Sequence, residues 1–481
     1  PGGSPARGGS PCLPRAGFFH LPLGVPMSKS PSTLLIPVEI QVRELDAKVL
    51  LAAVAAERGF PVILGSRAFV HFQSSSIAPG VYLAKSMRKL SIRMFEILRE
   101  LGHDIVAYDE EALVRYPDEE YYRRRLSPRT ISRVQHLLAW GEDDAAVLRA
   151  YPGYRGAPIH VTGNPRIDLM RPELREYYRP EAEAIHARFG DFVLVNTNFG
   201  SVNHFFDELS EYKKAAQTGE RAGAHPFEAG LGRHKLALFR HFLQMVPELC
   251  RALPDHTIVL RPQPVENHGP WLALAEHCPN LRVANEGNVV PWLMACRALV
   301  ANSCTTEVEG ALLDVPTVNY QPVTSELYDS ALATALSRPA REPVELCERV
   351  REMVAGTLGP LEPAIRRGTL APHVASLEGP LAADRIVDVL TSSGYLEHRP
   401  PRPPLATYAR GWLRNRIRSL GKRRNMRRPG HRNNMTYHAH RFPEIHAADV
   451  QERVDRFARL LGRFAQVRVE AAGEYTFRFH I

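Results

Sequence analysis

The chain has 481 residues, 44% of them hydrophobic, and a formal net charge of +9. This length is too great for one ordinary hydrophobic core, and this composition excludes a disordered chain, so we expect two domains with additional segments. The six cysteines are scattered without a C-x-x-C pair, which argues against a disulfide framework and structural zinc and favours a reducing, cytoplasmic location.

Residues 1–32 are expected to form a low-complexity leader, since they are rich in Pro and Gly and lack the basic and then apolar order of a signal peptide. No later run approaches the ~20 apolar residues that a helix needs to cross a bilayer. We therefore expect a protein that is neither exported nor inserted into a membrane.

The region 33–180 predicts a Rossmann-like domain. An apolar strand at 33–40 is followed by a helix at 43–59 that Gly59 ends, and then by a strand at 61–66. The pattern continues with a helix at 91–103, a strand at 104–108, a strand ending in VQHLL, a helix at 142–151 and a strand at 158–164. Alternating strands and helices predict a parallel sheet covered on both faces.

A second Rossmann-like domain is predicted over 190–340, after a charged junction at 172–190. Its strands are expected at 191–200, 256–262, 281–285, 298–303 and 316–320, with a long helix at 234–254 and a short one at 290–297. The polar, Gly-containing stretch 207–234 predicts a loop or partly helical insertion.

The chain beyond 340 is predicted as a C-terminal extension in three parts: a helical segment at 341–395, a basic Pro/Arg-rich segment at 396–445, and a helix plus hairpin at 446–481 with its turn at Gly473. Thirteen Arg and Lys and no acid lie between His398 and Pro443, so the rest of the chain nets about −4 (9 − 13).

The stretch 399–432 suits an anionic partner. Trp412, Leu413, Ile417 and Leu420 give it an apolar side, as in an interfacial helix on an anionic inner-membrane surface. An acidic glycan would also fit, as would a solvated, flexible arm. Nucleic acid is not expected as a partner, because no reading module is recognisable.

Ligands of open parallel sheets bind beyond the carboxyl ends of the strands, and five predicted strands here end in polar residues. These ends are Asp109-Glu110-Glu111, Gly163-Asn164-Pro165, Asn196-Thr197-Asn198, Arg261-Pro262-Gln263-Pro264 and Asn302-Ser303-Cys304-Thr305-Thr306.

Each strand end has a functional and a structural interpretation. Ser303, Thr305 and Thr306 precede a helix and suit a phosphate, or else form an ordinary N-cap. Arg261 can donate two hydrogen bonds to a phosphate or carboxylate, or make a surface salt bridge. Asn164, Asn196 and Asn198 either contact the ligand or make turns.

The acidic triplet Asp109-Glu110-Glu111 either caps the next helix from a solvated loop or supplies a general base or nucleophile. Glu309, one helical turn after the Ser/Thr motif, is placed to accept from ribose hydroxyls. The chain has no P-loop, G-x-G-x-x-G, G-x-S-x-G or H-E-x-x-H motif, which argues against kinase-like, hydrolase and zinc-protease chemistry.

Five motifs in order carry a resemblance: DEEAL, TGNPRIDL, VNTNFGSVNH, RPQPVENHGPW and NSCTTEVEGALLDVPTVNY. Over roughly 33–325 the sequence resembles the bacterial surface carbohydrate biosynthesis proteins, which are GT-B glycosyltransferase-like enzymes of capsule and lipopolysaccharide assembly. The resemblance implies an α/β fold with two Rossmann-like domains facing a central cleft.

The wider group resembles transferases that use CMP-activated sialic acid or Kdo. The resemblance implies a catalytic carboxylate in Asp109-Glu110-Glu111, most directly Asp109, and phosphate contacts from Gln263-Pro264 and from Ser303 to Thr306. It implies that Arg261 and a helix N-terminus stabilise the leaving CMP, with no metal and no cofactor besides the CMP-sugar donor. Ala112 and Gln263 depart from the usual glycine and histidine of these motifs, and Glu307 and Gly310 depart from those of the last one.

Three functions follow. The first is a cytoplasmic glycosyltransferase, peripheral on the inner membrane through 399–432, that transfers an acidic sugar from CMP to a glycan or glycolipid hydroxyl. The second is a sugar-nucleotide epimerase or glycerophosphotransferase on the same scaffold. The third is a non-catalytic sugar-nucleotide-binding protein.

Overall fold

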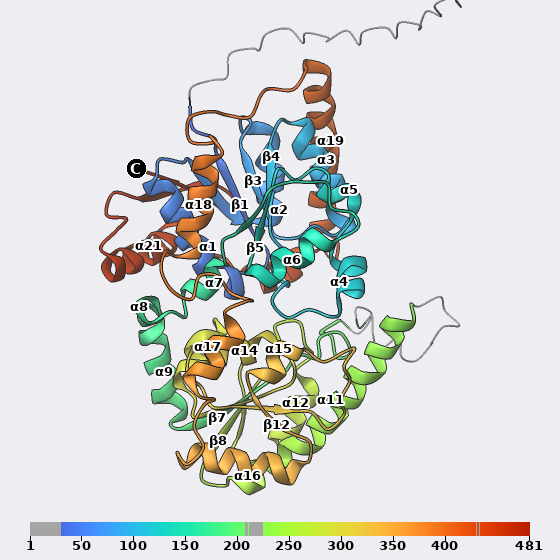
Figure 1. Ribbon diagram of the computed structural model, residues 1–481, viewed down its shortest axis with the longest axis vertical. Helices are drawn as coiled ribbons and strands as arrows, with labels where there is room; N and C mark the ends of the chain where they lie inside the picture. Colours follow the sequence, from blue (N-terminus) through green and yellow to red (C-terminus); the bar gives the residue numbers. More distant parts are fainter. Residues whose placement is uncertain (1–29, 207–209, 211–224, 430, 432) are drawn as a thin grey trace, which may run out of the picture.

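The computed structural model describes residues 30–206, 210, 225–429, 431 and 433–481. Two α/β domains are stacked along the long axis, each built around its own sheet (Figure 1). This is the GT-B-like arrangement of two Rossmann-like domains that the sequence predicts. The predicted leader up to residue 29 and most of the predicted insertion, 207–209 and 211–224, lie outside the described residues.

The N-terminal domain contains an eight-stranded sheet in the order β13-β14-β2-β1-β3-β4-β5-β6. Its strands from β1 to β6 are parallel and mostly buried on both faces, which explains why they read as continuous apolar runs. They are β1 (Leu34–Val38), β2 (Val62–Ser66), β3 (Val81–Ala84), β4 (Asp104–Ala107), β5 (His136–Ala139) and β6 (Ile159–Val161).

Helices cover both faces of this sheet. The Ala-rich helix α1 is buried along most of its length and packs against α7, α18 and α21, because small side chains permit close helix approach. The helices of this part are α1 (Gln41–Glu57), α2 (Arg67–Gln73), α3 (Ile92–Glu100), α4 (Asp118–Arg125), α5 (Pro128–Ile131), α6 (Glu142–Ala150) and α7 (Pro165–Asp168); α8 (Pro172–Arg175) and α9 (Arg179–Phe189) lead to the second domain.

The C-terminal domain contains a six-stranded parallel sheet in the order β12-β11-β10-β7-β8-β9. Its strands are β7 (Phe192–Asn196), β8 (Thr257–Arg261), β9 (Leu281–Val283), β10 (Ala298–Ala301), β11 (Thr317–Tyr320) and β12 (Arg338–Ala340). Its helices are α11 (Pro226–Ala252), α12 (Gly269–Ala275), α13 (Val289–Ala295), α14 (Thr305–Leu312), α15 (Ala331–Ala335), α16 (Pro343–Val354) and α17 (Pro363–Leu370).

Helix α11 begins at Pro226, eight residues before the helix predicted at 234–254. His225 caps it by accepting from the backbone N–H of Phe227 at 3.3 Å. The last part of the stretch predicted as a loop or partly helical insertion is therefore helical.

The C-terminal extension is shared between the two domains. Helix α16 covers the second sheet, whereas the chain from residue 382 onward returns to the N-terminal domain (Figure 1). The returning elements are α18 (Ala382–Ser392), α19 (Leu405–Met426), α20 (Met435–Arg441), α21 (Ala447–Leu461), β13 (Arg468–Gly473) and β14 (Thr476–His480).

Two contacts hold the returning segment against the N-terminal domain. The carboxylate of Asp168 accepts from the backbone N–H groups of Ala382 and Ala383, at 2.8 and 3.0 Å, and so caps α18. Strand β14 pairs antiparallel with β2 and buries Phe477 and Phe479, so the predicted hairpin forms the edge of the first sheet.

Helix α19 packs against α2 and α3, so the interpretation of this stretch as a flexible arm is wrong. Within the described residues no helix combines the length and the apolar character that crossing a membrane requires.

Candidate functional site

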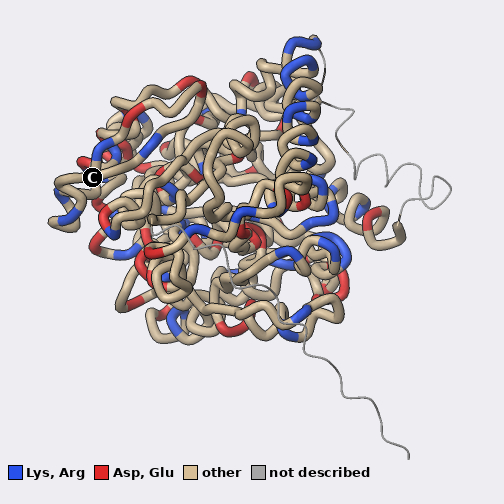
Figure 2. The backbone as a smooth tube through the Cα atoms, turned by 90° about the horizontal axis from the view of Figure 1, so that it is seen from above, with Lys and Arg blue, Asp and Glu red and all other residues tan. Residues whose placement is uncertain are grey.

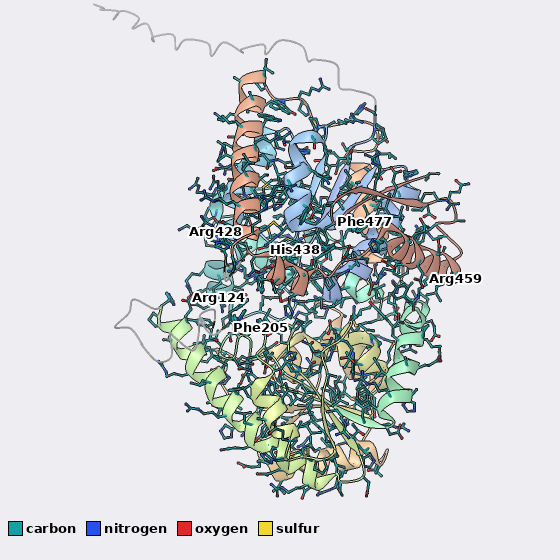
Figure 3. The ribbon with its side chains drawn as sticks, turned by 180° about the vertical axis from the view of Figure 1, so that it is seen from behind. Arg124, Phe205, Arg428, His438, Arg459 and Phe477 are labelled. Atoms are coloured by element: carbon teal, nitrogen blue, oxygen red, sulfur yellow. The ribbon has the colours of Figure 1, made fainter. Side chains whose placement is uncertain are left out.

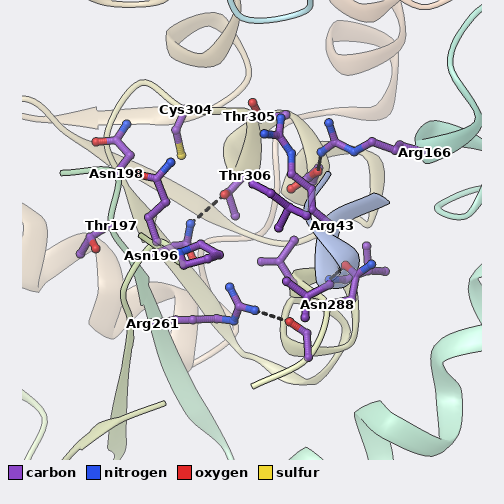
Figure 4. Close-up of a pocket in the computed structure, with 18 of the residues that line it drawn as sticks. Arg43, Arg166, Asn196, Thr197, Asn198, Arg261, Asn288, Cys304, Thr305 and Thr306 are labelled. Carbon is purple, nitrogen blue, oxygen red and sulfur yellow. Dashed lines mark hydrogen bonds and ion pairs between the residues drawn. The ribbon is translucent and has the colours of Figure 1, made fainter. Parts of the chain in front are cut away.

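A cavity lies between the two domains and is lined by both of them (Figure 4). Its lining contains both apolar and polar side chains, so the cavity suits an amphipathic ligand. The N-terminal domain and its connection contribute Ile40, Val42, Arg43, Glu111, Arg166, Leu169, Met170 and Tyr178; the C-terminal domain contributes Asn196, Thr197, Asn198, Arg261, Gln263, Pro264, Val265, Gly287, Asn288, Val289, Val290, Cys304, Thr305, Thr306 and Glu309.

Arg261 ends β8, directly beside Asn196 at the end of β7. Arg261 as a whole is 5% exposed, and its guanidinium donates to the carbonyl of Gly287 at 2.6 Å, while its Nε has no partner in the described structure. Burial lowers the pKa of Arg261 to about 10, and the nearby Glu309 opposes this shift. A buried cation with a free donor beside a cavity is suited to an anion.

The N-terminus of α14 meets the same cavity. Thr305 and Thr306 line it, and the Thr306 hydroxyl accepts from Asn196 Nδ2 at 2.7 Å. Ser303 has a φ of 43°, a left-handed conformation that a non-glycine residue holds at a cost. The positive end of the helix dipole therefore adds to the charge of Arg261 at this wall.

The N-cap residue of α14 is Cys304 and not one of the Ser or Thr residues, and the Glu307 side chain accepts from the backbone N–H of Cys304 at 2.6 Å. Burial raises the pKa of Glu307 to about 8, although this hydrogen bond opposes the shift. Burial therefore disfavours a negative charge on Glu307 at this helix end.

Lys235 of α11 belongs to this wall, and sequence reasoning missed it. Its Nζ donates to Asn198 Oδ1 at 3.2 Å and to Asn302 Oδ1 at 3.4 Å, and no carboxylate of the described residues lies within ion-pair distance. Burial lowers its pKa. Lys235 lines an adjoining cavity together with Ser303, and Asn198 and Thr305 line both cavities.

Glu111 is the acid that faces this wall from the N-terminal domain. Arg43 donates Nη1 and Nη2 to its two carboxylate oxygens, at 2.7 and 3.2 Å. Partial enclosure raises the pKa of Glu111, but the Arg43 charge and hydrogen bonds outweigh this effect and lower the pKa to about 2. Both residues line the interdomain cavity, the adjoining cavity and a third cavity inside the N-terminal domain.

The structure corrects the prediction that Asp109 projects into the cleft. Its carboxylate is buried in an ion pair with Arg125, whose Nε donates at 2.8 Å, and it lines none of the three cavities. Glu110 is also buried; it accepts from the Tyr108 hydroxyl at 3.1 Å and lines only the third cavity. Of the three acids, only Glu111 lines the interdomain cavity together with Arg261. Glu111 also lines the adjoining cavity, together with Ser303.

Asn164 is the N-cap of α7, with Oδ1 accepting from the backbone N–H of Arg166 at 3.0 Å, and it does not line the cavity. The turn-making interpretation therefore describes it. Arg166, which sequence reasoning missed, lines the cavity and donates to Glu309 Oε1 across the domains at 2.7 Å. Its Nη1 has no partner in the described structure. Glu309 is thus an interdomain ion-pair partner through its Oε1.

The remaining predicted residues divide into cavity lining and support. Gln263, Pro264 and Asn198 line the cavity. Asn302 lies behind it and donates to the carbonyl of Tyr320 at 2.7 Å. Glu266, a further residue that sequence reasoning missed, holds the strand-end loops together by accepting from Thr197 Oγ1 and the Phe199 backbone N–H, both at 2.8 Å.

The C-terminal segment also reaches the site. His440 of α20 lies 2.5 Å from the carbonyl oxygen of Pro264, and its ring stacks on Phe205 at 5.9 Å between centroids. Figure 3 shows His438, from the same helix, above Phe205 on the back of the molecule.

The lining is strongly basic. The two adjoining cavities between the domains contain three glutamates, Glu111, Glu120 and Glu309, against seven cations: Arg43, Arg115, Arg124, Arg125, Arg166, Lys235 and Arg261. No group of three His, Cys, Asp or Glu side chains suited to a metal ion occurs in the described part of the chain. The arrangement can bind a phosphate-bearing anion and offers one carboxylate opposite it.

No protein-family model matches the sequence, and no curated protein matches it. Among solved structures, UDP-GlcNAc 2-epimerase from Methanocaldococcus jannaschii aligns at 10% identity and a TM-score of 0.46, over 75% of this chain and 99% of that chain. The wall teichoic acid polymerase TagF aligns at 11% identity and a TM-score of 0.49, over 75% of this chain and 89% of that chain. A further UDP-N-acetylglucosamine 2-epimerase aligns at 10% identity and a TM-score of 0.48, over 78% of this chain and 100% of that chain.

Proposed function

We propose that the interdomain cleft binds a nucleotide-activated donor and that the protein is a glycosyltransferase of surface polysaccharide biosynthesis, transferring an acidic sugar from CMP to a glycan hydroxyl. One observation carries this proposal. Arg261, Lys235 and the N-terminus of α14 gather on one wall of the cleft, and the carboxylate of Glu111 faces them from the other domain.

This geometry suits the departure of a phosphate. When the sugar–oxygen bond to CMP breaks, negative charge grows on the phosphate, and preorganised cations and helix-end N–H groups stabilise it. The acceptor hydroxyl forms the new bond and passes its proton to Glu111. A donor phosphate offers Arg43 a second anionic partner, which frees the Glu111 carboxylate to accept that proton.

An acidic donor sugar fits the charge of the cleft. Arg166 lines the cavity with an unpartnered Nη1, and a guanidinium is well suited to a sugar carboxylate. Arg115 and Arg125 of the lining pair with Asp143 and Asp109, so the cations left for the phosphate are Arg261 and Lys235.

A second candidate, a glycerophosphotransferase or epimerase acting on a nucleoside diphosphate donor, is favoured by the length of the cationic wall. Arg261 lines one cavity and Lys235 the adjoining one, and Asn198, Gln263 and Thr305 line both. A wall extending through two cavities can hold two phosphates as well as one.

Thermal unfolding with cytidine, CMP, CDP, UDP and GDP tests both candidates. We expect CMP to stabilise the protein, by about 2.7 kcal/mol at a concentration one hundred times its dissociation constant. Cytidine is the control and is expected to have little effect, because it lacks the phosphate that the wall binds.

The rank order of the nucleotides decides between the candidates. A CMP response at least as large as that of CDP supports the transferase. A clear preference for CDP or UDP supports the diphosphate candidate, and no response to any nucleotide contradicts both and favours a protein that does not bind nucleotides.

A further inference from the structure

Helix α19 directs two cations into the third cavity, which lies inside the N-terminal domain. Arg418 and Lys422 are four residues apart and therefore lie on the same face of the helix, and both line this cavity of about 380 Å³. A space of this size is ample for a phosphate or carboxylate group. We call this cavity the α19 pocket.

The acids of the α19 pocket are already paired. Glu39 accepts from Arg67 at 2.9 Å and lies 3.2 Å from Lys85. Glu110 lies 3.5 Å from Lys48, and Glu111 pairs with Arg43. Each carboxylate of the lining therefore has its own cation.

Arg418 and Lys422 have no such partner. In the described structure neither side chain makes an ion pair, and Arg418 Nη1 is buried without a hydrogen bond, as is the ring Nδ1 of His71 across the pocket. Burial and the neighbouring charge of Arg418 together lower the pKa of Lys422 to about 7. Two enclosed, mutually repelling cations cost stability unless an anion joins them.

We propose that the α19 pocket binds an oxyanion, the phosphate or carboxylate of the acceptor. The binding of an anion rests on Arg418 and Lys422 alone. Its role as an acceptor site rests also on the proposed function, because Arg43 and Glu111 line both this pocket and the interdomain cleft and so connect the two.

The first test replaces the cations. We expect Arg418→Met combined with Lys422→Met to raise the unfolding temperature without ligand, because the uncompensated charges are removed. In wild type, inorganic phosphate and pyrophosphate are expected to raise the unfolding temperature, and the double variant should lose most of this effect. Arg416→Met is the matched control, since Arg416 lies on the exposed face of the same helix and should change neither result.

The second test measures the reactivity of Lys422 itself. Lys422, with its lowered pKa, should be acylated by N-hydroxysuccinimidyl acetate at pH 7.5 faster than exposed lysines, and phosphate should slow this reaction at least about fivefold. Peptide mass mapping measures it. Phosphate should slow the acylation of Lys422 equally in the Arg261→Ala variant, which would show that this anion site does not depend on the nucleotide wall.

These results distinguish the two proposals. Equal phosphate stabilisation of wild type and double variant, or acylation of Lys422 unaffected by phosphate, overturns the α19 pocket even if CMP still binds. Loss of CMP binding in wild type with retained Lys422 protection overturns the proposed function and its acceptor role, and leaves the anion site standing.

A separate observation concerns the outer face of α19. Apolar side chains of this helix face outward and polar ones face the domain, the reverse of the usual distribution. Leu413, Ile417 and Leu420 are 54%, 56% and 68% exposed, whereas Asn415 and Ser419 are buried against the domain. Leu405 and Trp412 continue the exposed apolar row, and Arg416 packs over the Trp412 ring at 5.1 Å.

Basic residues accompany this apolar row along α19 and its C-terminal end; Figure 2 shows where Lys and Arg lie along the backbone. Arg416, Arg423, Arg424 and Arg427 are exposed on the same helix and its C-terminal end, and no acid occurs from His398 to Pro443. An apolar row bordered by Arg is complementary to an anionic bilayer surface, where each cation adds about 1 kcal/mol.

We infer that the outer face of α19 docks on an anionic lipid bilayer. Flotation with vesicles of phosphatidylcholine and phosphatidylglycerol in equal parts should recover the protein, vesicles of phosphatidylcholine alone should recover little, and salt should weaken recovery. The variant Leu413→Ser, Ile417→Ser, Leu420→Ser should reduce binding at least about tenfold.

Leu272→Ser is the control for this variant, because Leu272 is comparably exposed on α12 of the other domain, at 52%. Unchanged vesicle binding by the triple variant contradicts the inference. So does a wild-type dimer that sedimentation velocity shows to dissociate in the triple variant, because the face would then be an interface between copies of this chain.

Discussion

Arg261→Ala is expected to weaken CMP binding about 10- to 100-fold, which corresponds to the ~1.5–3 kcal/mol typical of hydrogen bonds to a charged group. The reason is the position of Arg261 at the end of β8, where its buried guanidinium has a free Nε and lies beside the cavity. Titration calorimetry with CMP measures the change.

The stability of Arg261→Ala should change little. The substitution removes the hydrogen bond to Gly287, but it also removes a buried cation whose desolvation is only partly compensated. Arg282→Ala is the matched control, because Arg282 is an exposed arginine on the adjacent strand β9 and donates only to nearby backbone carbonyls. Wild-type affinity in Arg261→Ala would remove Arg261 from the nucleotide site.

The parts of the fold that the sequence predicts are those that local patterns determine. Buried parallel strands such as β1, β7 and β10 are continuous apolar runs, and the helices between them have caps and amphipathic spacing. The pairing of β14 with β2 is different, because it joins segments about 410 residues apart and nothing in either segment specifies the other.

Helix α19 shows a second limit of the sequence. The sequence predicts an apolar side, at Trp412, Leu413, Ile417 and Leu420, but it does not predict that the domain contacts the small and polar face, at Gly411, Asn415 and Ser419. A Cβ at Gly411 would lie 2.7 Å from Glu100 Cβ, so the close contact with α3 requires this glycine. Only the tertiary contacts show which face of this helix is buried.

The C-terminal wall of the site was predictable, because strand ends of a parallel sheet converge at one edge: Asn196 and Arg261 end strands, and Thr306 lies at the start of the helix that follows β10. Arg43, Arg166 and Lys235 were not, since each comes from a helix in which an Arg or Lys reads as a solvated side chain. Their function depends on which surface the helix presents to the other domain.

The sequence does not show which carboxylate of the acidic triplet reaches the cleft. The three consecutive acids after β4 point in different directions, and their partners determine which of them is buried. Arg125, sixteen residues later, pairs with Asp109, whereas Arg43 of α1 pairs with Glu111. A linear motif records that acids are present and not which of them reaches the cleft.

Glu111→Gln is therefore expected to reduce the release of CMP from a CMP-activated acidic sugar about 10²- to 10⁴-fold, the usual range for loss of a general base. Nucleotide affinity should stay near wild type, because Glu111 faces the phosphate wall and is not part of it. The Glu111 carboxylate is half-exposed, so the cost in stability should be small.

The pH dependence follows from the same ion pair. Because the pKa of Glu111 in the folded state, about 2, lies below that of the unfolded chain, the pair stabilises the fold above about pH 4 and this stability is lost as the pH falls toward 2. Comparing the acid unfolding of wild type and Glu111→Gln measures this contribution.

Asp109→Asn should give the opposite result. It leaves Arg125 without its buried partner, and the free energy of unfolding is expected to fall by about 3 kcal/mol, whereas the turnover of the protein that remains folded should change less than in Glu111→Gln. Urea unfolding and CMP release, measured on both variants, separate the two roles. If Asp109→Asn instead abolishes turnover at unchanged stability while Glu111→Gln retains it, the catalytic carboxylate is Asp109, and the ion pair with Arg125 must open when the donor binds.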